Sequence, residues 1–179
     1  MTWQTRSTHE VYGNRWIRVR EDAVTGPAGR GIYGVVEMRH PAVFVVAVDD
    51  EQRVCLVAVD RYTVGSSLEV PAGGSDGEDP LDAARRELAE EAGVAASEWE
   101  SLGVMNALNG IAVAPEHVFL ARGIGTVQDA AHTQAEEGID AVHWVPFADA
   151  LAMIADGRIT DGETIAALAY AGIRLGRFA

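Results

Sequence analysis

One stretch of this sequence, residues 71–94, constrains the fold more than any other. It is glycine-rich over residues 71–77 and then takes on a helical pattern. Asp79 is a residue type that caps helix N-termini, and Pro80 suits the first helical position. Gly93 suits the end of a helix, because glycine readily adopts the left-handed conformation found there. The stretch therefore predicts a loop that runs directly into a helix.

The predicted helix has two different faces. One carries small and apolar residues at helical spacing, suited to burial: Leu81, Ala84, Leu88 and Ala92. The other gathers Glu87, Glu90 and Glu91, which lie within one helical turn of each other. Carboxylates this close repel each other unless a cation lies among them, and Mg²⁺ prefers such oxygen ligands. The helix alone is equally compatible with a solvated acidic face.

A long pattern joins the loop to the helix. It consists of Gly73, Glu78 and the run Arg86-Glu87-Leu88-x-Glu90-Glu91-x-Gly93-Val94. This pattern resembles the signature sequence of the Nudix hydrolases. The helical half matches without gaps, but four residues separate Gly73 from Glu78, one fewer than the family pattern has. Either the loop is one residue short or Ala72 takes the place of the glycine.

Strand patterns dominate the sequence before the loop. Residues 15–20 roughly alternate arginine with apolar side chains, as in a half-buried strand, and residues 8–12 and 31–38 flank them across turns. Residues 42–48 and 54–59 are continuous apolar runs, typical of central strands that are covered on both faces. We therefore expect a small antiparallel sheet followed by the centre of a larger one.

The fold class follows from these patterns and the resemblance. Helical patterns at 147–155 and 164–170 close the sequence. With 179 residues, of which 48% are hydrophobic, we expect a single domain spanning residues 1–179. Its N-terminal β segment would be residues 1–39 and its catalytic core residues 40–179. The resemblance implies an α/β (α+β) fold, a Nudix-type α/β/α sandwich with a mixed central sheet, to which the antiparallel N-terminal segment is added.

Composition and charge exclude several classes of function. The net charge of −13 disfavours nucleic acid as a partner, because phosphate backbones need a basic face. No apolar run is long enough to span a bilayer, and no charged-then-apolar leader is present, so we expect a cytoplasmic protein without a membrane partner. Cys55 is the single cysteine, which excludes an intrachain disulfide. All basic residues are arginine, so no lysine nucleophile is available.

Two residues outside the signature resemble the ADP-ribose pyrophosphatase branch of the family. Arg61 follows a central strand and Glu69 precedes the glycine-rich loop, where many members of that branch carry the same residue types. Val59 and Asp60 stand where those members have glutamine and tyrosine, so the match is partial. Arg61 is suited to contact a substrate phosphate. The alternative is a structural salt bridge from Arg61 to Glu69 or Asp60.

Other substrate contacts are specified less well. The branch often has a glutamate four residues after a glycine, but Ala114 stands at that distance from Gly110, and Glu116 lies two residues further on. Trp16 has an aromatic ring that can stack on a base. The resemblance places Gly73 at the substrate phosphates. It also implies that the N-terminal strands build a homodimer.

The resemblance implies metal-assisted hydrolysis. The cation would be Mg²⁺, with Mn²⁺ as the alternative, held by Glu87, Glu90, Glu91 and the carbonyl oxygen of Ala72. It would polarise the phosphates and lower the pKa of a bound water. The roles of Glu78 and Arg86 would be structural, with the arginine pairing with Glu78 or a helix glutamate to hold the carboxylates in place.

A general base has to come from another segment. Glu136 and Glu137 lie in a polar loop, where related pyrophosphatases place a catalytic glutamate. Glu136 is the better match and Glu137 the second choice, with Glu91 as a further catalytic carboxylate.

Three functions remain open. The first is Mg²⁺-dependent hydrolysis of a nucleoside diphosphate sugar, with ADP-ribose giving AMP and ribose 5-phosphate. The second is the same chemistry on a triphosphate, dinucleotide or coenzyme. The third is a non-catalytic nucleotide-sugar sensor, against which the intact set of glutamates argues.

Overall fold

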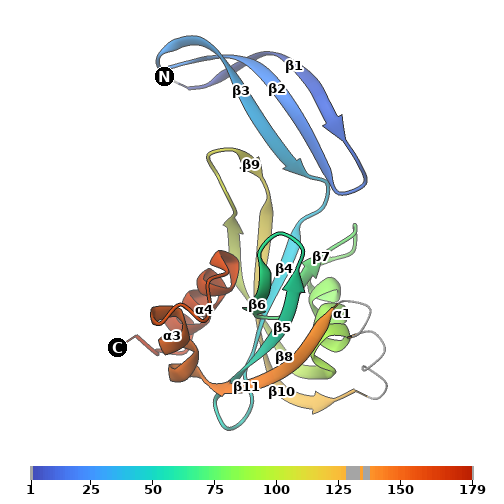
Figure 1. The fold of residues 1–179 in the computed structure, drawn as a ribbon, viewed down its shortest axis with the longest axis vertical. Helices are drawn as coiled ribbons and strands as arrows, with labels where there is room; N and C mark the ends of the chain where they lie inside the picture. Colours follow the sequence, from blue (N-terminus) through green and yellow to red (C-terminus); the bar gives the residue numbers. More distant parts are fainter. Residues whose placement is uncertain (1, 128–133, 135–137, 179) are drawn as a thin grey trace.

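The computed structural model describes residues 2–127, 134 and 138–178. The described chain combines three β-sheets with helices on two sides of the central strands (Figure 1). The helices are α1 (Pro80–Ala92), α3 (Phe147–Ala155) and α4 (Gly162–Arg174). No described helix is long and apolar enough to cross a membrane.

The N-terminal sheet is an antiparallel meander that projects away from the rest of the molecule (Figure 1). Its strands are β1 (Gln4–Gly13), β2 (Ile17–Gly26) and β3 (Gly29–Met38). The two-residue strand β9 (Ala112–Val113) adds to the edge of β3 in parallel. Every residue of β1 is exposed, so this sheet has little core of its own. The predicted N-terminal antiparallel segment is confirmed, with longer strands than the patterns indicated.

The central sheet is mixed, as predicted. Its order is β7-β4-β10-β8, and its members are β4 (Ala42–Ala47), β7 (Ala72–Gly74), β8 (Val94–Asn106) and β10 (Pro115–Thr126). Strands β4 and β10 run parallel, whereas β7 and β8 pair with them antiparallel. The smaller third sheet has the order β11-β5-β6, with β5 at Arg53–Arg61, β6 at Gly65–Glu69 and β11 at Ile139–Pro146.

The continuous apolar runs are explained by burial on both faces of the central strands. In β4, Val43 and Val45 pack in the cluster that contains the apolar residues of α1. Phe44 and Val46 pack on the opposite side, in the cluster formed with α3 and α4. Because successive side chains of a strand point to opposite faces, only a strand between two helical layers needs apolar residues at every position. The predicted α/β/α sandwich is confirmed.

Candidate active site

Local signals fix the helix that carries the acidic residues. The Oδ1 of Asp79 accepts a hydrogen bond from the backbone N–H of Leu81 at 2.9 Å, which caps α1. At the other end Gly93 adopts a left-handed conformation (φ 68°), and its N–H donates to the carbonyl of Ala89 at 3.1 Å. Both ends lie where the sequence predicted them, because each cap depends on neighbouring residues only.

The loop before α1 is a short strand followed by a tight turn. Gly73 lies in β7 opposite Val43 of β4. The turn then closes through a hydrogen bond from the N–H of Glu78 to the carbonyl of Ser75 at 2.8 Å. The short spacing between Gly73 and Glu78 is therefore taken up by this turn, and β7 remains paired with the central sheet.

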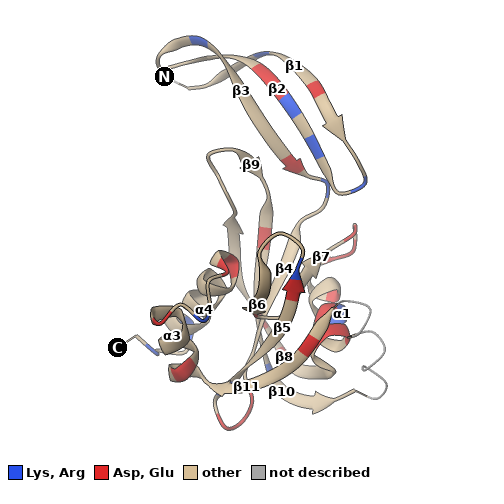
Figure 2. Cartoon of the chain, viewed as in Figure 1, with Lys and Arg blue, Asp and Glu red and all other residues tan. Residues whose placement is uncertain are grey.

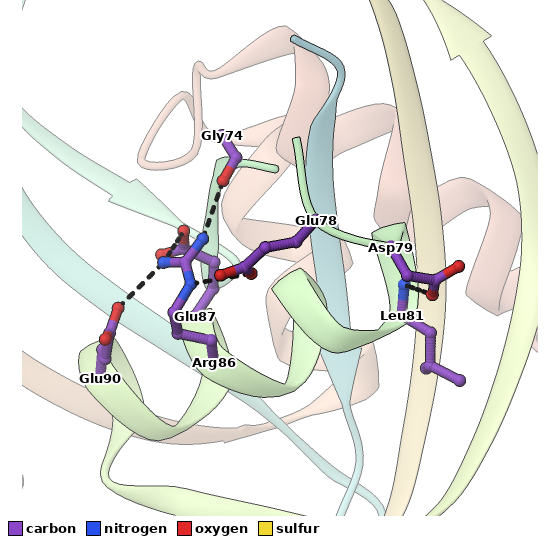
Figure 3. Close-up of polar contacts among 7 residues, drawn as sticks. All are labelled: Gly74, Glu78, Asp79, Leu81, Arg86, Glu87 and Glu90. Atoms are coloured by element: carbon purple, nitrogen blue, oxygen red, sulfur yellow. Dashed lines mark hydrogen bonds and ion pairs between the residues drawn. The ribbon is translucent and has the colours of Figure 1, made fainter. Parts of the chain in front are cut away.

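Arg86 connects this loop to the helix (Figure 3). Its guanidinium donates through Nε to Glu78 Oε2 at 3.2 Å and through Nη2 to the carbonyl of Gly74 at 2.9 Å. Nη1 donates to Glu87 Oε1 at 2.7 Å and to Glu90 Oε2 at 3.0 Å. Partial burial opposes the charged form, but these carboxylates outweigh it and raise the pKa of Arg86. Arg86 thus pairs with Glu78 and with helix glutamates at once.

Two of the three helix glutamates are buried. Glu87 is 7% exposed and Glu91 is 4% exposed, whereas Glu90 is more open to solvent. Glu91 Oε2 accepts a hydrogen bond from the backbone N–H of Ala72 at 2.8 Å. A Cβ added to Gly73 would overlap the Glu87 carboxylate, coming within 2.6 Å of Oε2. The buried carboxylates therefore lie directly against the backbone of β7, and only glycine allows that approach.

The oxygen atoms of the helix glutamates and of the β7 backbone match the ligand preference of a hard divalent cation. Carboxylate and carbonyl oxygens are the ligands that Mg²⁺ prefers, and glycine at position 73 lets the Glu87 carboxylate lie against the β7 backbone. Within the described part of the chain, no three acidic, histidine or cysteine side chains are already gathered around one point as they would be at a metal ion. Binding would therefore require the carboxylates of Glu87 and Glu90 to exchange the Arg86 guanidinium for the cation, at least in part.

A cavity of about 340 Å³ opens beside the signature loop. Its lining includes the backbone at Ala72 and Gly73, and the side chains of Arg61 and Glu69. Arg61 Nη2 donates to Glu69 Oε2 at 2.6 Å, so the salt bridge considered as an alternative role for Arg61 is present. That hydrogen bond is the largest cause of a raised pKa at Arg61. A guanidinium held by a buried glutamate is well oriented toward an anion in the cavity.

Further carboxyl groups line the same cavity, and of these only Glu116 was considered as a substrate contact from the sequence. They are Glu116 at the start of β10, and Asp161 and Glu163 at the start of α4. Figure 2 shows the acidic residues of both α1 and α4. Asp161 Oδ2 accepts from the N–H of Thr164 at 2.7 Å and so caps α4. From sequence the residues around 161 predict a helix start and nothing more, because their proximity to Glu116 arises only in the fold.

Comparison with known proteins decides the family. A model of the NUDIX domain matches residues 38–168, and a model of the nucleoside diphosphate sugar hydrolase N-terminal domain matches residues 3–36. The chain belongs to the Nudix family. It is a Nudix hydrolase, and its resemblance to that family is confirmed.

Several relatives of this Nudix hydrolase have been named. The methanol dehydrogenase activator of Bacillus methanolicus is 31% identical over 170 residues, covering 93% of this chain and 91% of that protein. An ADP-ribose pyrophosphatase of Mycobacterium tuberculosis is 32% identical over 176 residues, 96% of this chain and 81% of the other. A crystal structure of an ADP compounds hydrolase superposes with a TM-score of 0.83 at 19% identity, covering 100% of this chain and 97% of that one. This last likeness supports the fold.

The remaining predicted site residues of this Nudix hydrolase lie elsewhere. Trp16 is on the projecting N-terminal part, is 57% exposed, and has the Arg15 guanidinium 4.1 Å from its ring centroid. Glu136 and Glu137 lie outside the described residues. Close to them in sequence, the Nε2 of Gln134 donates to the backbone carbonyl of Glu91 at 3.0 Å. The structure therefore brings together Arg61, Glu69, Gly73 and the signature glutamates.

Proposed function

We propose that this Nudix hydrolase cleaves the pyrophosphate bond of a nucleoside diphosphate sugar with the help of Mg²⁺, and that ADP-ribose is its leading substrate. One observation carries the proposal. The buried carboxylates of Glu87 and Glu91 lie against β7, and the β7 backbone at Ala72 and Gly73 lines the same cavity as Arg61. The proposed cation site and an arginine thus flank one space. The Mycobacterium tuberculosis relative supports ADP-ribose by its name.

In the proposed reaction, water attacks one phosphorus of the pyrophosphate and the bridging oxygen leaves with the other phosphate. ADP-ribose and water give AMP and ribose 5-phosphate. A divalent cation held by Glu87, Glu90 and Glu91 would offset phosphate charge and would help to activate the attacking water. Arg61, held by Glu69, binds and orients the substrate phosphate. Arg86 holds the loop and the helix glutamates in register.

We assign the general base to Glu136, with Glu137 as the second choice. Support comes from Gln134, which lies two residues before Glu136 in the sequence and whose Nε2 donates to the Glu91 carbonyl near the end of α1. Glu136→Gln and Glu137→Gln, measured side by side, separate the two. The base variant should lose the acidic limb of its pH–rate profile together with most of kcat, because deprotonation of that carboxyl controls the rate. The other variant should keep both.

We also assign the N-terminal sheet to a homodimer interface, with Trp16 available to a substrate base. Large apolar side chains on this sheet are exposed: Trp3, Val11, Tyr12, Trp16, Ile32 and Met38. A monomer gains nothing from exposing such a set, whereas a second copy could cover it. Sedimentation equilibrium would measure the mass, and a monomer at all concentrations would contradict the assignment.

A substrate panel tests the proposed activity. The protein is incubated with Mg²⁺ and ADP-ribose, GDP-mannose, dinucleotides, coenzymes or triphosphates, and the products are separated by chromatography. ADP-ribose should give AMP and ribose 5-phosphate. No turnover of any compound would support the sensor alternative, and turnover of triphosphates alone would replace the nucleotide-sugar assignment.

Glu91→Gln tests the metal assignment within the same panel. It should lose a factor of roughly 10² or more in kcat, because a buried carboxylate ligand is lost while the shape of the side chain is kept. Glu98→Gln is the control, since Glu98 lies on β8 with its side chain 64% exposed. Both variants should keep the wild-type circular dichroism spectrum. An active Glu91→Gln enzyme would refute the assignment.

A further inference from the structure

Glu116 is a buried carboxylate, and one of its oxygens lacks a hydrogen-bond partner among the described residues. It lies second in β10, is 7% exposed, and its Oε2 forms no hydrogen bond with any residue that the structure describes. Burying a carboxylate oxygen that accepts no hydrogen bond costs about 1–3 kcal/mol. Such a group in a native fold calls for a partner that the polypeptide itself does not supply.

Glu116 lies between two cavities. One is the cavity of about 340 Å³ that also contains the backbone of the signature loop and Arg61. The other has a volume of about 370 Å³ and is lined mainly by apolar side chains, among them Met105, Leu108 and Ala166. Glu116 and Glu163 line both cavities. A ligand that extends from the phosphate region into the second space therefore passes these two side chains.

The charge around Glu116 defines which ligand groups can bind there. Glu163 and Asp161 line the first cavity with it, and burial together with their charge raises the pKa of Glu116 to about 7. The pKa of Glu163 is also raised, first of all by burial. Arg61, the cation that lines the first cavity, is assigned to the pyrophosphate in the proposed function. A third phosphate would be repelled here, whereas a hydroxyl can donate hydrogen bonds to these oxygens without bringing negative charge.

We propose that Glu116 and Glu163 form a subsite for the hydroxyl groups of the neutral sugar half of the substrate, and that the same pair selects against a third phosphate. The proposal rests on the proposed function, because it assumes that a pyrophosphate lies beside Arg61 and the signature loop. The proposal explains how the enzyme would select the group attached to the second phosphate, which the catalytic residues do not determine. The metal and the arginine recognise phosphate in any nucleotide, while Glu116 and Glu163 distinguish the group attached to the second phosphate.

Binding without turnover tests the subsite directly. Titration calorimetry in EDTA compares ADP-ribose with ADP, which lacks the sugar. In Glu116→Ala the affinity for ADP-ribose should fall about 10-fold or more, the effect of losing a hydrogen bond to a buried carboxyl group. The affinity for ADP should stay within about twofold. Glu163→Gln should show a smaller change in the same direction, and the control Glu98→Gln should show none.

The outcomes separate this proposal from the activity itself. An equal change for ADP and ADP-ribose in Glu116→Ala would overturn the subsite even if the enzyme hydrolyses ADP-ribose. The selective loss would support it even if no hydrolysis is seen. A third arm uses CDP-choline, whose terminal group is a cation without a sugar hydroxyl. If wild type binds CDP-choline more tightly than ADP-ribose, the subsite recognises positive charge and the hydroxyl assignment is wrong.

Discussion

Glu116→Gln should make the protein more stable at alkaline pH, although the side chain lies in the candidate site. The ionised form of Glu116 is disfavoured by burial and by Glu163 and Asp161, which raise its pKa from 4.5 to about 7. Arg61 and Glu69, which line the same cavity, are bound to each other. Glutamine keeps the shape of the side chain and removes the charge, so it removes this cost.

The magnitude and its sign follow from proton linkage. Because the folded-state pKa is the higher one, the native protein holds a proton on Glu116 that the unfolded chain has released between about pH 4.5 and 7. Stability therefore falls as the pH rises through this window. Each pKa unit corresponds to about 1.4 kcal/mol, so the ionised carboxylate costs up to about 3 kcal/mol at pH 8 and under about 1 kcal/mol at pH 5.

Urea denaturation followed by circular dichroism measures the difference. In EDTA buffer, Glu116→Gln should exceed wild type by about 1–3 kcal/mol at pH 8, and by clearly less at pH 5. Glu98→Gln, which neutralises an exposed carboxylate on β8, should change stability by under about 0.5 kcal/mol at either pH. The reasoning is refuted if Glu116→Gln is less stable than wild type at pH 8, or if its effect is the same at both values.

Two other substitutions probe the packing of the site. Gly73→Ala should cost about 1–3 kcal/mol and weaken Mn²⁺ binding in a calorimetric titration, because the new Cβ would displace the Glu87 carboxylate. Gly74→Ala is the matched control, because the atom nearest to a Cβ added at Gly74 lies at an ordinary contact distance of 3.5 Å. Equal effects of Gly73→Ala and Gly74→Ala would contradict the argument. Thr164→Val should cost about 1–3 kcal/mol in urea denaturation, because the buried Oγ1 accepts a hydrogen bond from the N–H of Val70 at 3.1 Å; a neutral change would show that water replaces it.

The signature helix could be predicted closely because its determinants are local. Asp79 and Gly93 act on adjacent residues, and the apolar stripe needs only helical periodicity. The continuous apolar runs were equally informative, since burial on both faces demands them. The burial of Glu87 and Glu91 could not be predicted from the sequence as closely. These two carboxylates face the β7 backbone only because β7 pairs with β4. No residue of the helix determines that pairing.

The grouping of Glu116 with Glu163 in one cavity could not be predicted, for a different reason. Glu116 and Glu163 come from elements far apart in the sequence, and each has an ordinary local interpretation, in a strand and at a helix start. Only the packing of α4 beside β10 brings them to one cavity. Their pKa values depend on that packing as well, because burial is the leading cause for both. Sequence patterns describe neighbours along the chain and miss partners of this kind.

The contact between Val70 and Thr164 also bears on how the molecule assembles during synthesis. It joins residues 94 positions apart, and it fixes α4 to the strand connection that leads into the signature loop. Since the ribosome releases the chain from its N-terminus, α1 emerges well before α4. An unfinished chain thus carries the carboxylates of the signature helix without Asp161 and Glu163. The cavity therefore gains the last of its acidic lining residues when the C-terminal helix docks.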